Sequence, residues 1–152
     1  MFRGRNLLIY WLPVLVWMSL IFTASGDTHS AQHSSRIIEP VLRWLFPHLG
    51  DGTIQQIVFL VRKCAHMAEY ALLALLVWRA LRRPVRRDRR PWRWSQAGFA
   101  LLGTALYAGS DEIHQLFVPT REGKFADVMI DAAGAALALL ALWLLGKWRK
   151  LW

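Results

Sequence analysis

Two stretches of this chain place ionisable side chains inside sequence that is otherwise strongly apolar. In residues 57–78 the polar side chains recur every three or four positions, which puts them on one helical face: Lys63, His66, Glu69 and Tyr70. In residues 107–134 a second set lies where one apolar run ends and the next begins: Asp111, Glu112, His114, Gln115, Arg121, Glu122, Lys124, Asp127 and Asp131. Ionisable groups in apolar surroundings are costly unless they pair or face water, so these sets indicate a functional site.

Eight of these side chains form the candidate site: Lys63, His66, Glu69, Asp111, Glu112, Gln115, Arg121 and Asp127. Guanidinium and ammonium groups bind phosphate, which suits Arg121, Lys63 and the nearby Lys124. The carboxylates could hold a divalent cation or act with His66 as general acid and base. Together these residue types fit phosphoester or related transfer chemistry. Tyr70 and Tyr107 could direct their hydroxyls toward the site, and His114 lies just off the face that Asp111 and Gln115 share.

Other interpretations of the same residues stay open. In a purely structural one, Lys63 pairs with Glu69 or Asp111 and Arg121 pairs with Asp127, and these pairs fix the helix register. In a second, the site binds or masks a ligand without chemistry. In a third, the acidic groups and His66 carry protons or lipid across the membrane. The chain contains no serine, cysteine or histidine motif of a known hydrolase, so whether it is an enzyme is undecided.

The elements that position these residues are predicted to be membrane helices. The 152 residues are 55% hydrophobic, with nine tryptophans and a mean hydropathy of +0.27. Stretches of roughly 20 mainly apolar residues are long enough to cross a bilayer, and four occur: residues 6–24, 57–78, 95–117 and 127–146. We expect one all-α membrane domain over residues 1–152, a bundle of four transmembrane helices. The first stretch could alternatively be a signal peptide.

Positive charge predicts the orientation of the bundle. The formal net charge is +9, and eight arginines lie between the second and third spans: Arg79, Arg82, Arg83, Arg86, Arg87, Arg89, Arg90 and Arg93. Residues 25–56 and residues 118–126 contain two basic residues each. We therefore expect the arginine loop and both termini on the cytoplasmic side of the cytoplasmic membrane, and the polar site in the outer half. No basic stripe is interleaved with aromatic residues outside these flanks, which argues against nucleic acid as a partner.

Local signals predict further details. In residues 36–46, RIIEPVLRWLF, apolar residues recur at helical spacing with charged residues between them, which predicts a short amphipathic helix in the first outer connection. Pro40 would lie in its first turn. Thr53 and Gln56 have the spacing of a capping box that would start the second span. Pro119 is expected to stop the third span. Three glycines are expected to permit close helix packing: Gly103, Gly109 and Gly134.

Taken together, the sequences KCAHMAEYALLALL and YAGSDEIHQLFVPTREGKFADVMIDAAGA resemble those of VanZ-like membrane proteins, a family named for an accessory protein associated with teicoplanin resistance. The resemblance covers essentially the whole chain and includes a small, polar turn, FTASG, after the first span. It implies a multi-spanning protein of the cytoplasmic membrane with a role at the cell envelope, without supplying a reaction. The expected partners are membrane lipid and an envelope precursor or a lipoglycopeptide.

Overall fold

The computed structural model describes residues 3–26, 30–85, 88–119 and 123–152, without the side chains of residues 3–6 and 30–34. These described residues form five α-helices and no strand, which confirms the all-α prediction. The helices are α1 (Arg3–Ser25), α2 (Ser30–Leu45), α3 (Asp51–Arg82), α4 (Trp94–Gln115) and α5 (Phe125–Trp148).

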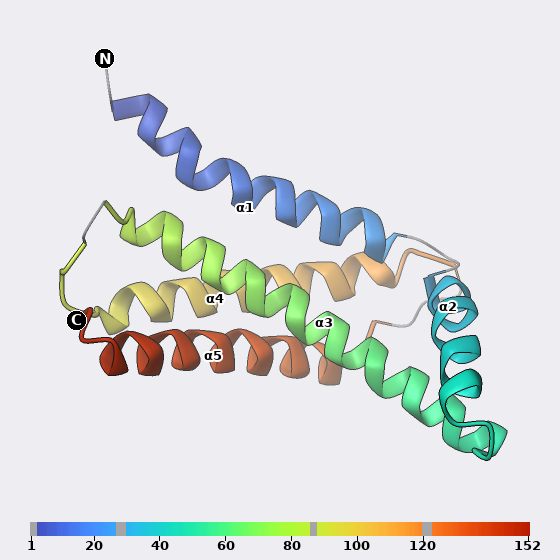
Figure 1. Cartoon of the computed structure of the whole chain (residues 1–152). Helices are drawn as coiled ribbons and strands as arrows, with labels where there is room; N and C mark the ends of the chain where they lie inside the picture. The colour runs from blue at the N-terminus through green and yellow to red at the C-terminus, as the bar shows by residue number, and fades with distance from the viewer. Residues whose placement is uncertain (1–2, 27–29, 86–87, 120–122) are drawn as a thin grey trace.

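The longest helix, α3, organises the others. It packs against α1, α2, α4 and α5, and α4 also packs against α5. Figure 1 shows α1, α4 and α5 running alongside α3, while α2 lies across the far end of α3. The start of α1, the end of α3, the start of α4 and the end of α5 lie together at the opposite end of the molecule (Figure 1). The long helices that follow one another in the chain therefore alternate in direction, whereas α3 and α5, which pack together, run in the same direction (Figure 1).

Three of the helices are long and apolar enough to cross a membrane: Leu7–Ser25, Asp51–Arg82 and Phe125–Trp148. The third predicted span, residues 95–117, corresponds to α4, which is not among them because polar residues interrupt it and acidic residues end it. The 32 residues of α3 extend about 48 Å at 1.5 Å per residue. That is longer than the roughly 30 Å apolar core of a bilayer, and Figure 1 shows α3 crossing its neighbours obliquely.

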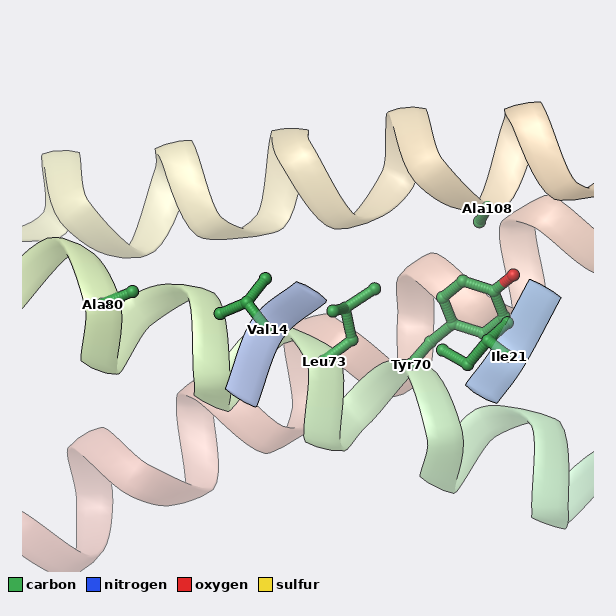
Figure 2. Packing of buried hydrophobic residues seen from close by; sticks show 6 residues of the cluster. All are labelled: Val14, Ile21, Tyr70, Leu73, Ala80 and Ala108. Atoms are coloured by element: carbon green, nitrogen blue, oxygen red, sulfur yellow. The ribbon is translucent and has the colours of Figure 1, made fainter. Parts of the chain in front are cut away.

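Small side chains bring the helices close together around two apolar clusters. The first cluster joins α1, α3 and α4 and is shown in Figure 2: Val14, Ile21, Tyr70, Leu73, Ala80 and Ala108. The second joins α3, α4 and α5: Ala74, Trp78, Ala97, Ala100, Ala135 and Leu139. Many large apolar side chains point outward instead, including Leu8, Leu12 and Leu15 of α1, as expected where the surrounding solvent is lipid.

Of the three glycines predicted to permit close packing, Gly134 does so. A Cβ atom at Gly134 would lie 2.6 Å from the backbone oxygen of Met67, so only glycine allows α5 to approach α3 this closely. The prediction is wrong for Gly103 and Gly109, since a Cβ at either position would meet nothing within 4 Å among the described residues. Glycine spacing alone does not say which side of a helix faces a neighbour.

Several predicted helix boundaries are wrong. The helix α3 begins at Asp51 after Gly50, with no side-chain capping bond, so Thr53 is already helical and the predicted capping box does not form. The amphipathic helix predicted for residues 36–46 is present, but it begins at Ser30. Pro40 therefore lies in the interior of α2 rather than in its first turn. The helix α4 ends at Gln115, two residues before the predicted end of the third span and ahead of Pro119.

The arginine-rich end is held by a buried arginine. Arg82 is 3% exposed, and its guanidinium donates to Asp88 and to two backbone oxygens while lying over the rings of Trp78 and Trp152. Hydrogen bonds from Arg90 and the charge of Arg82 hold the pKa of the Asp88 carboxyl well below its usual value. This part of the arginine loop thus has a defined fold in addition to its predicted role in orientation.

Candidate functional site

The carboxylate of Asp111 joins three helices at the end of the molecule opposite the arginine loop. Its Oδ2 accepts hydrogen bonds from the Ser25 hydroxyl of α1 at 2.7 Å, from the Tyr70 hydroxyl of α3 at 3.1 Å and from Gln115 Nε2 at 3.2 Å. Asp111 is 3% exposed, and its Oδ1 is buried with no hydrogen-bond partner among the described residues. Three donors on one oxygen compensate for burial of the carboxylate and fix α1 against α3 and α4.

Glu112 anchors the connection that follows α4. Its Oε2 accepts the backbone N–H of Lys124 at 2.8 Å, and its Oε1 accepts Gln115 Nε2 at 3.2 Å. A Cβ at Gly123 would clash with the backbone oxygen of Glu112, so the chain approaches α4 where only glycine fits. Glu112 and Gln115 are both buried. These contacts determine where α5 begins relative to the end of α4.

Two half-buried charged pairs involve further residues of the two polar stretches. Lys63 Nζ of α3 lies 2.5 Å from Asp127 Oδ1 of α5, and His66 Nδ1 lies 3.6 Å from Glu69 Oε2. These four side chains are between 23% and 36% exposed. The backbone oxygen of Glu69 also accepts the indole N–H of Trp17 at 2.9 Å, which ties α1 to this level of α3. The networks around Asp111 and Glu112 and these two pairs together are called the polar cluster. The half-buried pairs are the part of this cluster that a ligand could reach.

Asp131 lies one helical turn after Asp127 on α5 and is 3% exposed. Asp131, Asp111 and Glu112 thus bring three buried carboxylates to this end of the molecule. Across the parts of the chain that the structure covers, no group of three or more His, Cys, Asp or Glu side chains is placed to hold a metal ion. Asp111 and Glu112 accept hydrogen bonds from protein donors in this arrangement.

The structure joins the two stretches through Lys63 with Asp127 and through Tyr70 with Asp111, and the part of these residues in chemistry stays a prediction. Arg121 and Glu122 lie outside the described residues, so the predicted phosphate-binding arginine has no assigned position. Lys124 contributes its backbone N–H to Glu112.

Two aromatic candidates turn away from the cluster. His114 stacks on Phe22 of α1, with ring centroids 4.2 Å apart. The Tyr107 hydroxyl donates to the backbone oxygen of Met18 at 2.6 Å rather than to a site carboxylate. Tyr70, in contrast, reaches from α3 toward α4 (Figure 2). Its hydroxyl donates to Asp111, which agrees with the prediction that this hydroxyl could be directed toward the site.

Two features of the cluster were not predicted from the sequence. One is the hydrogen bond from Ser25 to Asp111, and the other is the ion-pair partner of Lys63. The signal for Ser25 was the small, polar turn FTASG at the end of the first span. The partner of Lys63 is Asp127, whereas the structural interpretation paired it with Glu69 or Asp111. Helical spacing places Lys63 on a face of α3, but which carboxylate it meets depends on how α5 packs against that face.

Most of the chain matches a known protein family. Residues 10–146, nearly the whole chain and every described part of the polar cluster, match the VanZ/LLP1 family. No curated protein and no solved structure matches the chain. Because the match covers well over half of the sequence and includes all five helices wholly or in large part, the chain belongs to the VanZ/LLP1 family.

Proposed function

We propose that this protein acts on a phosphate-bearing, lipid-linked component of the cell envelope at the outer face of the cytoplasmic membrane. The observation that carries the proposal is the difference in burial within the cluster. The network around Asp111 is buried, whereas the pairs Lys63–Asp127 and His66–Glu69 are partly exposed. The buried network supplies rigidity, and the half-exposed pairs supply groups that can exchange partners.

The chemistry assigned to each exposed group follows from its type and neighbours. Lys63 would bind the substrate phosphate as a point charge, in competition with Asp127. His66 beside Glu69 would transfer a proton at the reacting oxygen, because a neighbouring carboxylate stabilises the imidazolium that forms. Asp111 would act as a positioning residue, since its Oδ2 already accepts three protein donors.

We place the protein across the membrane in four spans, with both termini in the cytoplasm. The 22 residues of α4 extend about 33 Å, which is sufficient length. Its buried polar residues have hydrogen-bond partners, since Asp111 accepts donors from α1 and α3 and Gln115 donates to Asp111 and Glu112. The start of α1, the end of α5 and the ends that flank the arginine loop lie together (Figure 1). Positive-inside counting then directs the polar cluster outward.

Binding without turnover is the second candidate function. It is favoured by the His66–Glu69 separation of 3.6 Å, which is longer than a hydrogen bond. In this case the cluster would mask an envelope component or bind a lipoglycopeptide, and the family resemblance makes tolerance to teicoplanin the phenotype to examine.

The decisive experiment compares envelope lipids and precursors in cells that express the wild type, His66→Asn or Glu69→Gln at matched membrane levels. Asp51→Asn is the control, because Asp51 is an exposed carboxylate outside the cluster. Under the proposal, one phosphate-bearing species changes in abundance with the wild type and the control but with neither cluster variant. If no species changes and both cluster variants lose teicoplanin tolerance, turnover is refuted and binding is supported.

A separate measurement tests the orientation. In a background with the single cysteine Cys64 replaced by serine, we would introduce Arg43→Cys or Arg89→Cys, both at exposed positions. A membrane-impermeant thiol reagent applied to intact cells should label position 43 and leave position 89 unlabelled. The reverse pattern would place the polar cluster on the cytoplasmic side and would contradict an outer-face substrate.

A further inference from the structure

A groove between α2 and the first turns of α3 lies outside the polar cluster. It encloses about 760 Å³, and charged or polar side chains from both helices line it: Arg36, Glu39, Arg43, Gln55 and Arg62. Arg62 adjoins Lys63 along α3, so the groove and the polar cluster lie on neighbouring faces of one helix at the same level. The two sites are distinct because they share no side chain.

Positive charge predominates in this groove. Arg43 is already neutralised, since its Nη2 lies 2.7 Å from Glu39 and 2.8 Å from Asp51. Glu39 also accepts Gln55 Nε2 at 3.2 Å, so the one acidic side chain in the lining is occupied. The exposed Arg36 side chain has no hydrogen bond or ion pair to any residue that the structure describes. Three guanidinium groups line the groove against one carboxylate: Arg36, Arg43 and Arg62 against Glu39. The groove therefore favours an anion.

An apolar hollow adjoins the charged groove and shares Gln55 with it. This hollow encloses about 420 Å³ and is lined by Gln55, Gln56, Phe59 and Leu60. Phe59 and Leu60 are both more than half exposed. A charged groove that shares a lining residue with an apolar hollow fits a ligand that carries an anionic group and a hydrocarbon chain.

The position of α2 places both hollows at a membrane surface. Its apolar side chains are strongly exposed, with Ile37 at 70% and Trp44 at 80%, and α2 lies across the end of the long helices (Figure 1). An amphipathic helix in this orientation buries its apolar face at the boundary between headgroups and acyl chains. The arginines on its other face then lie at headgroup level, where lipid phosphates are found.

We propose that this groove is a binding site for an anionic glycerophospholipid. The guanidinium groups of Arg36 and Arg62 would hold the phosphate as charge-assisted donors, and one acyl chain would lie against Phe59 and Leu60. This site goes beyond the proposed function, because it needs only the membrane setting of α2 and makes no use of the polar cluster. It would hold α2 on the outer leaflet beside the cluster.

The test is lipid binding by the full-length protein in detergent, followed as lipid adducts by native mass spectrometry. The probes are dioleoylphosphatidylglycerol, dioleoylphosphatidylcholine and inorganic phosphate. We expect Arg36→Gln/Arg62→Gln to weaken phosphatidylglycerol binding about tenfold or more, whereas Arg89→Gln/Arg93→Gln, in the arginine loop, should stay within about twofold of the wild type. Arg36→Gln alone should weaken phosphatidylglycerol binding severalfold. Because Arg36 is exposed and has no described side-chain partner, this single variant shows whether the loss of binding in the double variant could come from misfolding.

Three outcomes would overturn the proposal. Unchanged phosphatidylglycerol affinity in both groove variants would show that the arginines do not hold the phosphate. Equal affinity for phosphatidylcholine would show that the site does not select an anion. Displacement of phosphatidylglycerol by equimolar inorganic phosphate would show that the acyl chain adds nothing. None of these results depends on whether the polar cluster performs chemistry.

Discussion

Removing the hydroxyl of Tyr70 tests the hydrogen-bond network that positions the polar cluster. Tyr70 is 1% exposed and donates to the buried carboxylate of Asp111 at 3.1 Å. A hydrogen bond to a charged group contributes about 1.5–3 kcal/mol, and Tyr70→Phe keeps the ring and its packing. Because about 1 kcal/mol corresponds to about 2–4 °C in a chain of this size, we expect Tyr70→Phe to lower the melting temperature by about 3–12 °C.

A matched control separates this charged bond from an ordinary one. The Tyr107 hydroxyl donates to the neutral backbone oxygen of Met18, and such bonds contribute about 0.5–1.5 kcal/mol. Tyr107→Phe should therefore cost about half as much as Tyr70→Phe. Thermal unfolding of the purified protein in detergent, followed by tryptophan fluorescence, measures both.

A double-mutant cycle makes the test quantitative. In an Asp111→Asn background the acceptor keeps its shape but loses its charge, so the cost of Tyr70→Phe should fall by about half, while the cost of Tyr107→Phe should not change. The reasoning is refuted if Tyr70→Phe costs no more than Tyr107→Phe and the cost is the same in both backgrounds. That result would mean that Asp111 does not organise α3 and α4 through its charge.

Two further predictions concern packing and pH. Gly134→Ala should destabilise the fold by about 1–3 kcal/mol, because the new Cβ would meet the Met67 backbone. Gly103→Ala, in open space, should be neutral or stabilising by up to about 1 kcal/mol, and equal melting shifts would contradict the close approach of α3 and α5. The lowered pKa of Asp88, held mainly by Arg90, contributes stability that is complete above its unfolded value of about 3.9 and is lost as the pH falls below it. The difference in melting temperature between wild type and Asp88→Asn should therefore shrink from pH 6 to pH 3, and a constant difference would exclude this linkage.

Much of the molecule follows from local pattern in the sequence. Runs of apolar residues predict helices α1, α3 and α5, because only a helix satisfies its own backbone polar groups in lipid. The spacing of Lys63, His66 and Glu69 predicts one polar face, and motif resemblance predicts the family that the match over residues 10–146 shows. These features need only the chain's own periodicity and composition.

The tertiary structure decides which groups meet. Ser25 of α1 donates a hydrogen bond to Asp111 of α4, and Lys63 of α3 forms an ion pair with Asp127 of α5. Both contacts depend on how the packed helices are rotated and how they cross, since this determines which faces touch. Of the three glycines predicted to permit close packing, only Gly134 lies against a neighbouring backbone. Periodicity assigns a residue to a helix face, whereas partner choice depends on interhelical packing summed over many side chains from distant parts of the chain.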